Sequence, residues 1–312
     1  MTDRPSLDEL FDQRLTYPDP EAQERCAQLV GLDDHKVRLS KILGLLVNPA
    51  GLEKWAQEHH PGVNRILTTV LRRPPLVVLA GDVGSGKSEL AETIGDSVAR
   101  QQNIDITLLP LSLSARGQGR VGEMTQLLSA AFNYTVEEAR KLQSSGKAAR
   151  GAVILLVDEA DALAQSRESA QMHHEDRAGV NAFIRGVDCI ANGRLPAAVI
   201  MCTNRLSALD PAVRRRAADI LPFERPNENQ RRAVLGPPLD ELGFNEDQVT
   251  ALVAATGARD GNTQGFTYSD LTQRLLPGIV LDAYPDHPIN VKRALEIAKK
   301  MAPTPRFMDG NT

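Results

Sequence analysis

Residues 75–88 read PLVVLAGDVGSGKS, an apolar run that leads directly into a glycine-rich loop. The last eight of these residues match the pattern GxxxxGK[ST], and helical spacing begins at Glu89. A strand, this loop and a helix in that order form a phosphate-binding loop, because glycines let successive N–H groups point at phosphate oxygens. The alternative is an ordinary glycine turn with an incidental lysine. The sequence therefore predicts a nucleotide site at this loop.

Two residues of the loop have predicted roles of their own. Lys87 is expected to reach the β- and γ-phosphates, and the Ser88 hydroxyl is expected to ligate Mg²⁺. The whole set predicted to bind the nucleotide here is Gly81, Asp82, Val83, Gly84, Ser85, Gly86, Lys87, Ser88 and Glu89.

Carboxylates follow a second apolar run that ends at Val157. Ligand sites of parallel sheets lie at the carboxyl ends of strands, which is where Asp158 and Glu159 fall. Asp158 is predicted to complete the Mg²⁺ shell, and Glu159 to accept a proton from the water that attacks the γ-phosphate. The alternative is a pair of helix N-terminal acids stabilised by the helix dipole. Asp161 is expected to be a solvated residue without a role.

Two later features complete a predicted hydrolytic site. A third apolar run ends just before Asn204, whose amide is placed to orient the attacking water, although Asn after a strand is also an ordinary turn residue. Arg214, Arg215 and Arg216 follow as three adjacent arginines. They cannot all serve one site in their own subunit, so Arg215 and Arg216 are the candidates to reach a neighbouring subunit's nucleotide. A solvated basic helix end is the alternative.

The apolar runs predict an α/β fold. They show no polar alternation and are separated by segments with helical spacing, which indicates parallel strands covered by helices on both faces. The five predicted strands are Leu76–Ala80, Ile104–Leu113, Ala152–Val157, Ala197–Cys202 and Ile220–Phe223. From Asn227 onward only helical stretches follow. The predicted organisation is a helical lead-in at 1–28, a large α/β domain with a five-stranded parallel sheet at 29–226, and a small all-helical domain at 227–312.

The composition excludes several classes of protein. The chain has 312 residues, of which 42% are hydrophobic and 24% are charged, as in soluble globular proteins. Lys and Arg number 36 against 40 Asp and Glu, so the net charge of −4 gives no global positive field to hold nucleic acid. Three distant cysteines suit a reducing compartment. No signal peptide is evident and no apolar run reaches the roughly 20 residues that cross a bilayer. We expect a cytoplasmic protein without membrane contact.

These motifs, in this order and with a helical tail, resemble the AAA+ ATPases over nearly the whole chain. Val30 and Gly31 begin a segment similar to the part of that family that contacts adenine. The resemblance implies ATP and Mg²⁺ as cofactors. It also implies a homo-hexameric ring in which the next subunit completes each site.

Within this superfamily the chain is most similar to the pachytene-checkpoint remodellers, on the segments SLSARGQGRVGEM, GVNAFIRGVD and RAADI. That resemblance implies an ATP-driven machine that partly unfolds a HORMA-domain partner through a central pore. It also implies a compact bacterial form with a role in cyclic-nucleotide antiphage signalling. The alternatives are a DNA-directed motor, such as a clamp loader or branch-migration ATPase, and a nucleotide-gated scaffold that does not hydrolyse ATP.

The sequence departs from the family pattern at two positions. The predicted substrate-gripping pore loop is Arg120, Val121 and Gly122, with Arg120 where an aromatic residue is usual. Ser269 stands where many relatives carry an arginine that senses the γ-phosphate. Grip at the pore would then come from Val121 and from aliphatic stems, and another group would have to replace the sensing arginine.

Overall fold

The computed structural model describes residues 10–113, 123–143, 149–163, 174–207, 209–258 and 264–306. Contacts group the chain into two units. The first unit comprises Met1–Ala27, Asp34–Ala80 and Ser88–Pro222, and the second comprises Gln28–Asp33, Gly81–Lys87 and Phe223–Thr312. The segment Gly81–Lys87, called the glycine loop below, is therefore grouped with the C-terminal helices. The division predicted after residues 28 and 226 stays a prediction.

The first unit is built on a sheet of six strands in the order β1-β3-β4-β5-β2-β6. Parallel registers join β3 to β4, β4 to β5 and β5 to β2, which confirms the α/β class. Ala80 lies opposite Thr203 and Val157 lies opposite Met201, so these strands end at one edge of the sheet. The strands are β1 (Leu15–Tyr17), β2 (Leu76–Gly81), β3 (Asp105–Ser112), β4 (Gly151–Asp158), β5 (Ala197–Thr203) and β6 (Ala217–Phe223).

The sheet has one strand more than the sequence predicts. β1 pairs antiparallel with β3, with Thr16 opposite Thr107. The prediction of helices alone before residue 29 was wrong at this point, because only one of the three β1 side chains is buried and no apolar run marks the strand. Helix α2 (Pro20–Gln28) follows it, as predicted.

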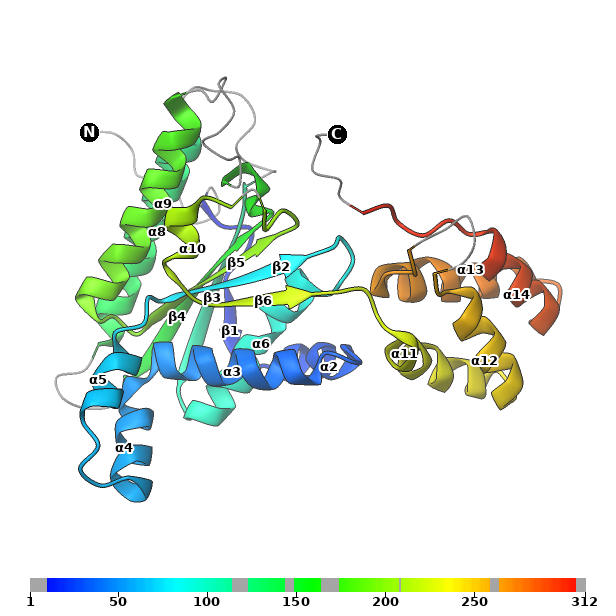
Figure 1. The fold of residues 1–312 in the computed structure, drawn as a ribbon, viewed down its shortest axis with the longest axis horizontal. Helices are drawn as coiled ribbons and strands as arrows, with labels where there is room; N and C mark the ends of the chain where they lie inside the picture. Colours follow the sequence, from blue (N-terminus) through cyan, green and yellow to red (C-terminus); the bar gives the residue numbers. More distant parts are fainter. Residues whose placement is uncertain are drawn as a thin grey trace. The chain divides into compact units, whose positions relative to one another are not determined.

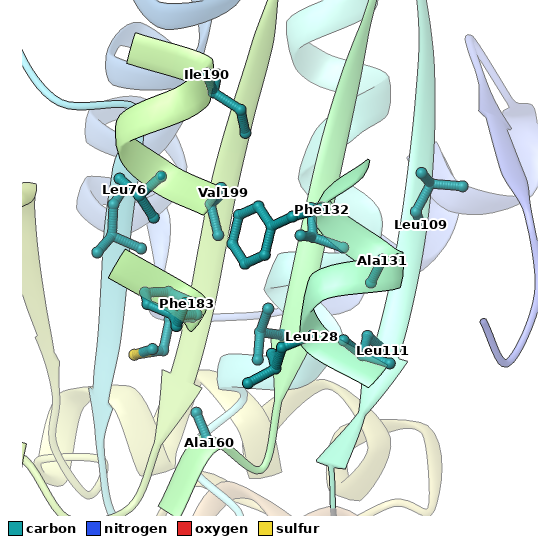
Figure 2. Close-up of a cluster of buried hydrophobic side chains, with 14 of the residues drawn as sticks. Leu76, Leu109, Leu111, Leu128, Ala131, Phe132, Ala160, Phe183, Ile190 and Val199 are labelled. Carbon is teal, nitrogen blue, oxygen red and sulfur yellow. The ribbon is translucent and has the colours of Figure 1, made fainter. Parts of the chain in front are cut away.

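Helices cover both faces of this sheet (Figure 1). α8 and α9 lie on one face, and α2, α3 and α6 lie on the other. Figure 2 shows Phe132 of α8 and Phe183 of α9 above β4 and β5, with ring centroids 5.5 Å apart in an edge-to-face arrangement. The helices of the first unit are α2, α3 (Asp33–Val47), α4 (Pro49–His59), α5 (Arg65–Leu71), α6 (Lys87–Gln102), α8 (Glu123–Leu142), the one-turn η1 (Ala160–Leu163), α9 (His174–Gly193) and α10 (Pro211–Arg214). The strand ends are thus fixed by a buried core.

The second unit contains no strand of its own among its described residues after Phe223, as predicted. Asn227 and Asn245 form capping boxes that start its first two helices. Its helices are α11 (Glu228–Glu241), α12 (Glu246–Ala255), a π-helical segment η2 (Asp270–Leu275), α13 (Leu276–Ala283) and α14 (Val291–Lys300). Their apolar faces form a separate core around Leu252, Phe266 and Leu275. Within the described ranges of both units, no helix is long and apolar enough to span a bilayer.

Candidate functional site

The glycine loop has a backbone shape that requires glycine. Gly84 and Gly86 have φ angles of 71° and 90°, in the left-handed region that L side chains disfavour. A Cβ on Gly81 would lie 1.9 Å from the main-chain oxygen of Phe223, and a Cβ on Gly86 would lie 3.0 Å from Leu32 Cδ1. The loop is therefore a closely packed cradle lined by backbone, which suits phosphate oxygens.

Lys87 is buried, and the loop itself holds its ammonium group. Nζ donates to the main-chain oxygens of Gly81 at 3.0 Å and Asp82 at 2.7 Å, and it lies 3.3 Å from Ser85 Oγ. The Ser85 hydroxyl donates to the main-chain oxygen of Asp82 at 2.7 Å. These contacts fix a positive charge inside the cradle, where the pattern predicts contact with the β- and γ-phosphates.

The two residues after Lys87 belong to the first unit. Ser88 is half-buried in the first turn of α6. The Glu89 carboxylate accepts a hydrogen bond of 2.8 Å from Arg25 Nε, and Arg25 Nη2 donates to Glu92 at 2.9 Å. Glu89 was predicted to contact nucleotide, and in the structure its carboxylate is engaged by an arginine.

The predicted adenine segment packs against α11 and the residues before η2, within the second unit. Gly31 has a φ of 78° and its carbonyl oxygen accepts a 2.7 Å hydrogen bond from Gln230 Nε2. A Cβ on Gly31 would lie 2.9 Å from Tyr268 Oη, a buried hydroxyl that has no hydrogen-bond partner among the described residues. Burial, with a smaller effect of Asp33, raises the pKa of Tyr268 to about 12, so the hydroxyl stays protonated. Val30 joins this segment through its N–H, which donates to Gln28 at 2.9 Å.

Gln230 and Tyr268 were not predicted from the sequence. No spacing in the sequence connects either residue with Gly31, because each lies more than 190 residues along the chain from it. An unsatisfied buried hydroxyl is costly. The Tyr268 hydroxyl therefore favours a ligand with a hydrogen-bonding group, such as a nucleotide base or ribose, beside Gly31.

The acidic pair lies at the end of β4 in the first unit. Asp158 Oδ1 accepts the backbone N–H of Glu159 at 2.8 Å. Glu159 is exposed and has a φ of 51°, a left-handed conformation that costs a residue with a side chain about 1–3 kcal/mol. Strain of this kind concentrates at functional sites. Glu159 follows β4 directly, at the sheet edge where β5 also ends.

Asn204 is oriented by Asp161, an acid that the sequence suggested to be solvated. Asp161 of η1 accepts three hydrogen bonds from the end of β5: from Thr203 Oγ1 at 2.6 Å, Asn204 N at 2.8 Å and Asn204 Nδ2 at 2.9 Å. The expectation that Asp161 is solvated and without a role was therefore wrong. The amide nitrogen of Asn204 is thus held by Asp161, which leaves the amide oxygen as the side chain's other polar atom.

The three adjacent arginines differ in what holds them. Arg214 donates from Nε to Leu209 at 3.0 Å and from Nη2 to Ser207 at 2.7 Å. Arg216 makes two hydrogen bonds to the Asp188 carboxylate, at 2.7 and 2.9 Å. Arg215 lies just after the four-residue helix α10, is exposed, and makes a 3.3 Å contact from Nε to Pro211. Of the two predicted candidates, Arg215 is the more available to a second subunit.

The structure describes only one of the two positions at which the sequence departs from the family pattern. Arg120, Val121 and Gly122 lie outside the described residues. Ser269 lies against the glycine loop: its N–H donates to Gly84 at 3.1 Å, and its hydroxyl donates to Gln273 at 2.8 Å. The serine at this position therefore contacts the loop through its backbone.

The residue types fit a nucleotide with Mg²⁺. Hydroxyl and carboxylate oxygens, as supplied by Ser88 and Asp158, are the ligands that Mg²⁺ prefers, and this ion commonly completes its shell with waters and substrate phosphates. Within the described part of the chain, no group of three or more His, Cys, Asp or Glu residues is placed to hold a metal ion.

Comparisons with known proteins find close relatives. The model of the ATPase family associated with various cellular activities (AAA) matches residues 77–225. CD-NTase-associated protein 6 of Escherichia coli strain MS 115-1 is 67% identical over 309 residues, which cover 99% of each chain.

Two solved structures are also similar to this chain. One is the E. coli MS115-1 HORMA:CdnC:Trip13 complex, in which the matching chain is 67% identical with a TM-score of 0.90, covering 98% of this chain and 100% of that one. The other is Rhizobiales Trip13, at 59% identity and a TM-score of 0.74, covering 95% of this chain and 100% of that one.

Proposed function

The chain belongs to the AAA ATPases, and from this we propose that it hydrolyses ATP to ADP and phosphate with Mg²⁺ and uses the cycle to unfold part of a HORMA-domain protein. One observation carries the choice of partner. A protein that is 67% identical over 98% of this chain was solved in a complex with HORMA and CdnC. The same likeness supports a role in cyclic-nucleotide antiphage signalling, in the cytoplasm.

Each predicted residue has one role in the proposed cycle. Lys87 and the N–H groups of the glycine loop bind the β- and γ-phosphates. Glu159 takes a proton from the attacking water, and Asn204, turned by Asp161, positions that water with its amide oxygen. When bound to Ser88 and Asp158, Mg²⁺ supplies positive charge that stabilises the transferred phosphoryl group.

The proposed assembly is a homo-hexameric ring. Its site is complete when a neighbouring subunit supplies positive charge to the γ-phosphate. Arg215 is proposed for this role because Arg214 donates to the main-chain oxygens of Leu209 and Ser207 and Arg216 is paired with Asp188. Residues 120–122 are proposed to grip the partner in the ring's pore, and neither nucleic acid nor membrane is expected as a substrate.

The test uses the HORMA protein of the E. coli MS 115-1 complex as substrate. Wild-type chain should hydrolyse ATP faster when this protein is added. Glu159→Gln should bind ATP, lose hydrolysis by about 100-fold or more, and retain the HORMA protein in a stable complex that size-exclusion chromatography detects. Lys87→Ala is the matched control, because it should neither bind ATP nor retain the HORMA protein.

Two outcomes would overturn the proposal. One is a wild-type chain whose ATPase rate does not respond to the HORMA protein and whose Glu159→Gln variant does not retain it. The other is an ATPase rate that duplex DNA stimulates instead, which would favour a DNA-directed motor.

A further inference from the structure

Asp82 is a member of the glycine loop that the GxxxxGK[ST] pattern does not require, yet its side chain has a specific partner. Asp82 Oδ2 accepts a hydrogen bond of 2.7 Å from Arg225 Nε. Only 14% of the Asp82 side chain and 8% of the Arg225 side chain are exposed. Arg306 approaches the same oxygen at 3.6 Å, but 65% of its side chain is exposed. Arg225 is therefore the buried counter-charge of Asp82.

The remaining donors of Arg225 reach two other segments of the second unit. Nη1 donates to the carbonyl oxygen of Gly265 at 2.7 Å, and Nη2 donates to that of Thr304 at 2.8 Å. Arg225 itself lies between β6 and α11. A guanidinium has donors in a fixed planar fork, whereas a lysine ammonium is a point charge on a flexible stem. A lysine here would have to reach the three acceptors from one nitrogen, whereas Arg225 uses three separate nitrogens.

The contact continues from Asp82 to the lysine of the cradle. The main-chain oxygen of Asp82 accepts the 2.7 Å hydrogen bond from Lys87 Nζ, while the Asp82 side chain is held by Arg225. The position of Asp82 therefore sets where an acceptor for the ammonium lies. Its negative charge also lies next to a site that must accept a polyphosphate.

A second set of contacts also joins the glycine loop to the segments around Gly265 and Thr304. Ser269 N–H donates to Gly84, and a Cβ on Gly84 would lie 3.0 Å from Thr267 Oγ1. The fully buried carboxylate of Asp270 accepts hydrogen bonds from the N–H of Thr267 at 3.0 Å and from Thr304 at 2.9 and 2.7 Å. Thr304, whose carbonyl oxygen accepts a hydrogen bond from Arg225, is thus itself held in place by Asp270.

We propose that Arg225 is a positioning residue for nucleotide binding. It neutralises Asp82 and keeps the glycine loop open to phosphate. Ser269, which also contacts this loop, offers no charged side chain for that purpose. The inference rests on the proposed ATP site and assigns a role to a residue outside its motifs. Without Arg225, the Asp82 carboxylate beside the cradle would keep only the weak, exposed contact with Arg306 and would repel the phosphates. If Asp82 is also replaced by a neutral residue, that repulsion is absent.

A double-mutant cycle tests this prediction in the full chain, with a fluorescent ATP analogue as the probe and its dissociation constant as the measurement. Arg225→Ala should weaken binding by about 10- to 100-fold, and Arg225→Lys should recover only part of it. Asp82→Asn combined with Arg225→Ala should bind within about threefold of Asp82→Asn alone. Arg306→Ala, the exposed arginine near the same oxygen, should change binding by less than about twofold.

Circular dichroism and thermal melting establish that each variant is folded, and Asp82→Asn keeps the cycle informative if Arg225→Ala is unstable. Because neutralising Asp82 should restore binding only if charge repulsion caused the loss, the cycle separates charge repulsion from a general loss of structure. The proposal is overturned if folded Arg225→Ala binds as wild type, or if removing the Asp82 charge restores nothing. If wild type itself binds no ATP analogue, the proposed function fails instead.

Discussion

Asp161 shows how one side chain can set the chemistry of another. Its carboxylate lies on η1, after β4, and binds Thr203 and Asn204 at the end of β5. The three hydrogen bonds fix which end of the Asn204 amide points away from the acid. They depend on the register that places Val157 opposite Met201. No spacing within the acidic motif reveals this, which is why the sequence suggested a solvated residue.

We predict that Asp161→Asn slows ATP hydrolysis without weakening ATP binding. An amide at position 161 presents an N–H where a carboxylate oxygen accepted one, so the Asn204 amide should turn or lose its partner. The expected result is a kcat lower by about 10- to 100-fold with a KM within about twofold of wild type. Steady-state ATPase kinetics provide the measurement.

The exposed acid Asp240 supplies a control for that variant, because Asp240→Asn removes the same charge far along the chain from the predicted site. Its kinetics should match wild type. A KM that rises in parallel with the loss of kcat in Asp161→Asn would show that Asp161 acts on binding, and the positioning role would be wrong.

Close packing of α8 against α9 depends on the glycine at position 186. A Cβ on Gly186 would lie 2.1 Å from the ring of Phe132. We predict that Gly186→Ala lowers the free energy of unfolding by about 1–3 kcal/mol, because the ring must move in a packed core. Urea denaturation followed by circular dichroism measures the change.

The matched variant is Gly278→Ala in α13, where a Cβ would lie 3.9 Å from Ile297 Cγ2, an ordinary van der Waals distance. Since alanine favours helix over glycine, this change should leave stability unaltered or raise it by up to about 1 kcal/mol. If both variants were equally destabilised, close packing of α8 on α9 would not be the cause.

The helices of the second unit should be sensitive to acid through Asp270. Burial by itself would raise the pKa of Asp270, but hydrogen bonds from Thr267, Thr304 and Arg274 outweigh it and hold the pKa below the ordinary value of 3.8. A carboxyl with a lowered folded-state pKa stabilises the fold above its unfolded-state pKa, and this stabilisation is lost as pH falls through the folded-state value. The expected loss therefore begins below about pH 4.

We predict that Asp270→Asn makes the melting temperature less dependent on pH below pH 4 and lower than that of wild type at pH 7. The first change follows because the titrating group is absent, and the second because an amide cannot accept all of the same hydrogen bonds. Scanning calorimetry across this range measures both. Parallel pH profiles in the two proteins would contradict the assignment to Asp270.

Elements differ in how far sequence alone could predict them. The buried strands β2, β4 and β5 are continuous apolar runs. A short apolar run between two helical segments is best explained as a buried parallel strand, so these strands could be predicted. β1 could not be found, because three residues at a sheet edge with one buried side chain carry no period. The glycine loop was found because its function fixes its residue types locally. Arg225 was not, because its partners lie 40 to 143 residues away.

The source of the positive charge for the γ-phosphate concerns the assembled ring and not one subunit. In the proposed ring, Lys87 and Glu159 act within one subunit and Arg215 acts on the next. Closed rings repeat one head-to-tail interface, so every site needs residues from two neighbours. Mixing variants distinguishes this arrangement from one in which all residues act in the same subunit.

We predict that Lys87→Ala and Arg215→Ala, each inactive alone, recover ATPase activity when subunits are mixed in equal amounts and allowed to exchange. A site is intact only where a subunit that keeps Lys87 is followed by one that keeps Arg215, which random mixing gives at about one interface in four. ATPase activity of the mixture should therefore approach a quarter of wild type. A mixture of Lys87→Ala with Glu159→Gln is the control and should stay inactive, because these two residues must be intact in the same subunit. If the Arg215→Ala mixture also stays inactive while the variants co-assemble, Arg215 does not act across the interface, and the charge must come from Arg216 or from within the subunit.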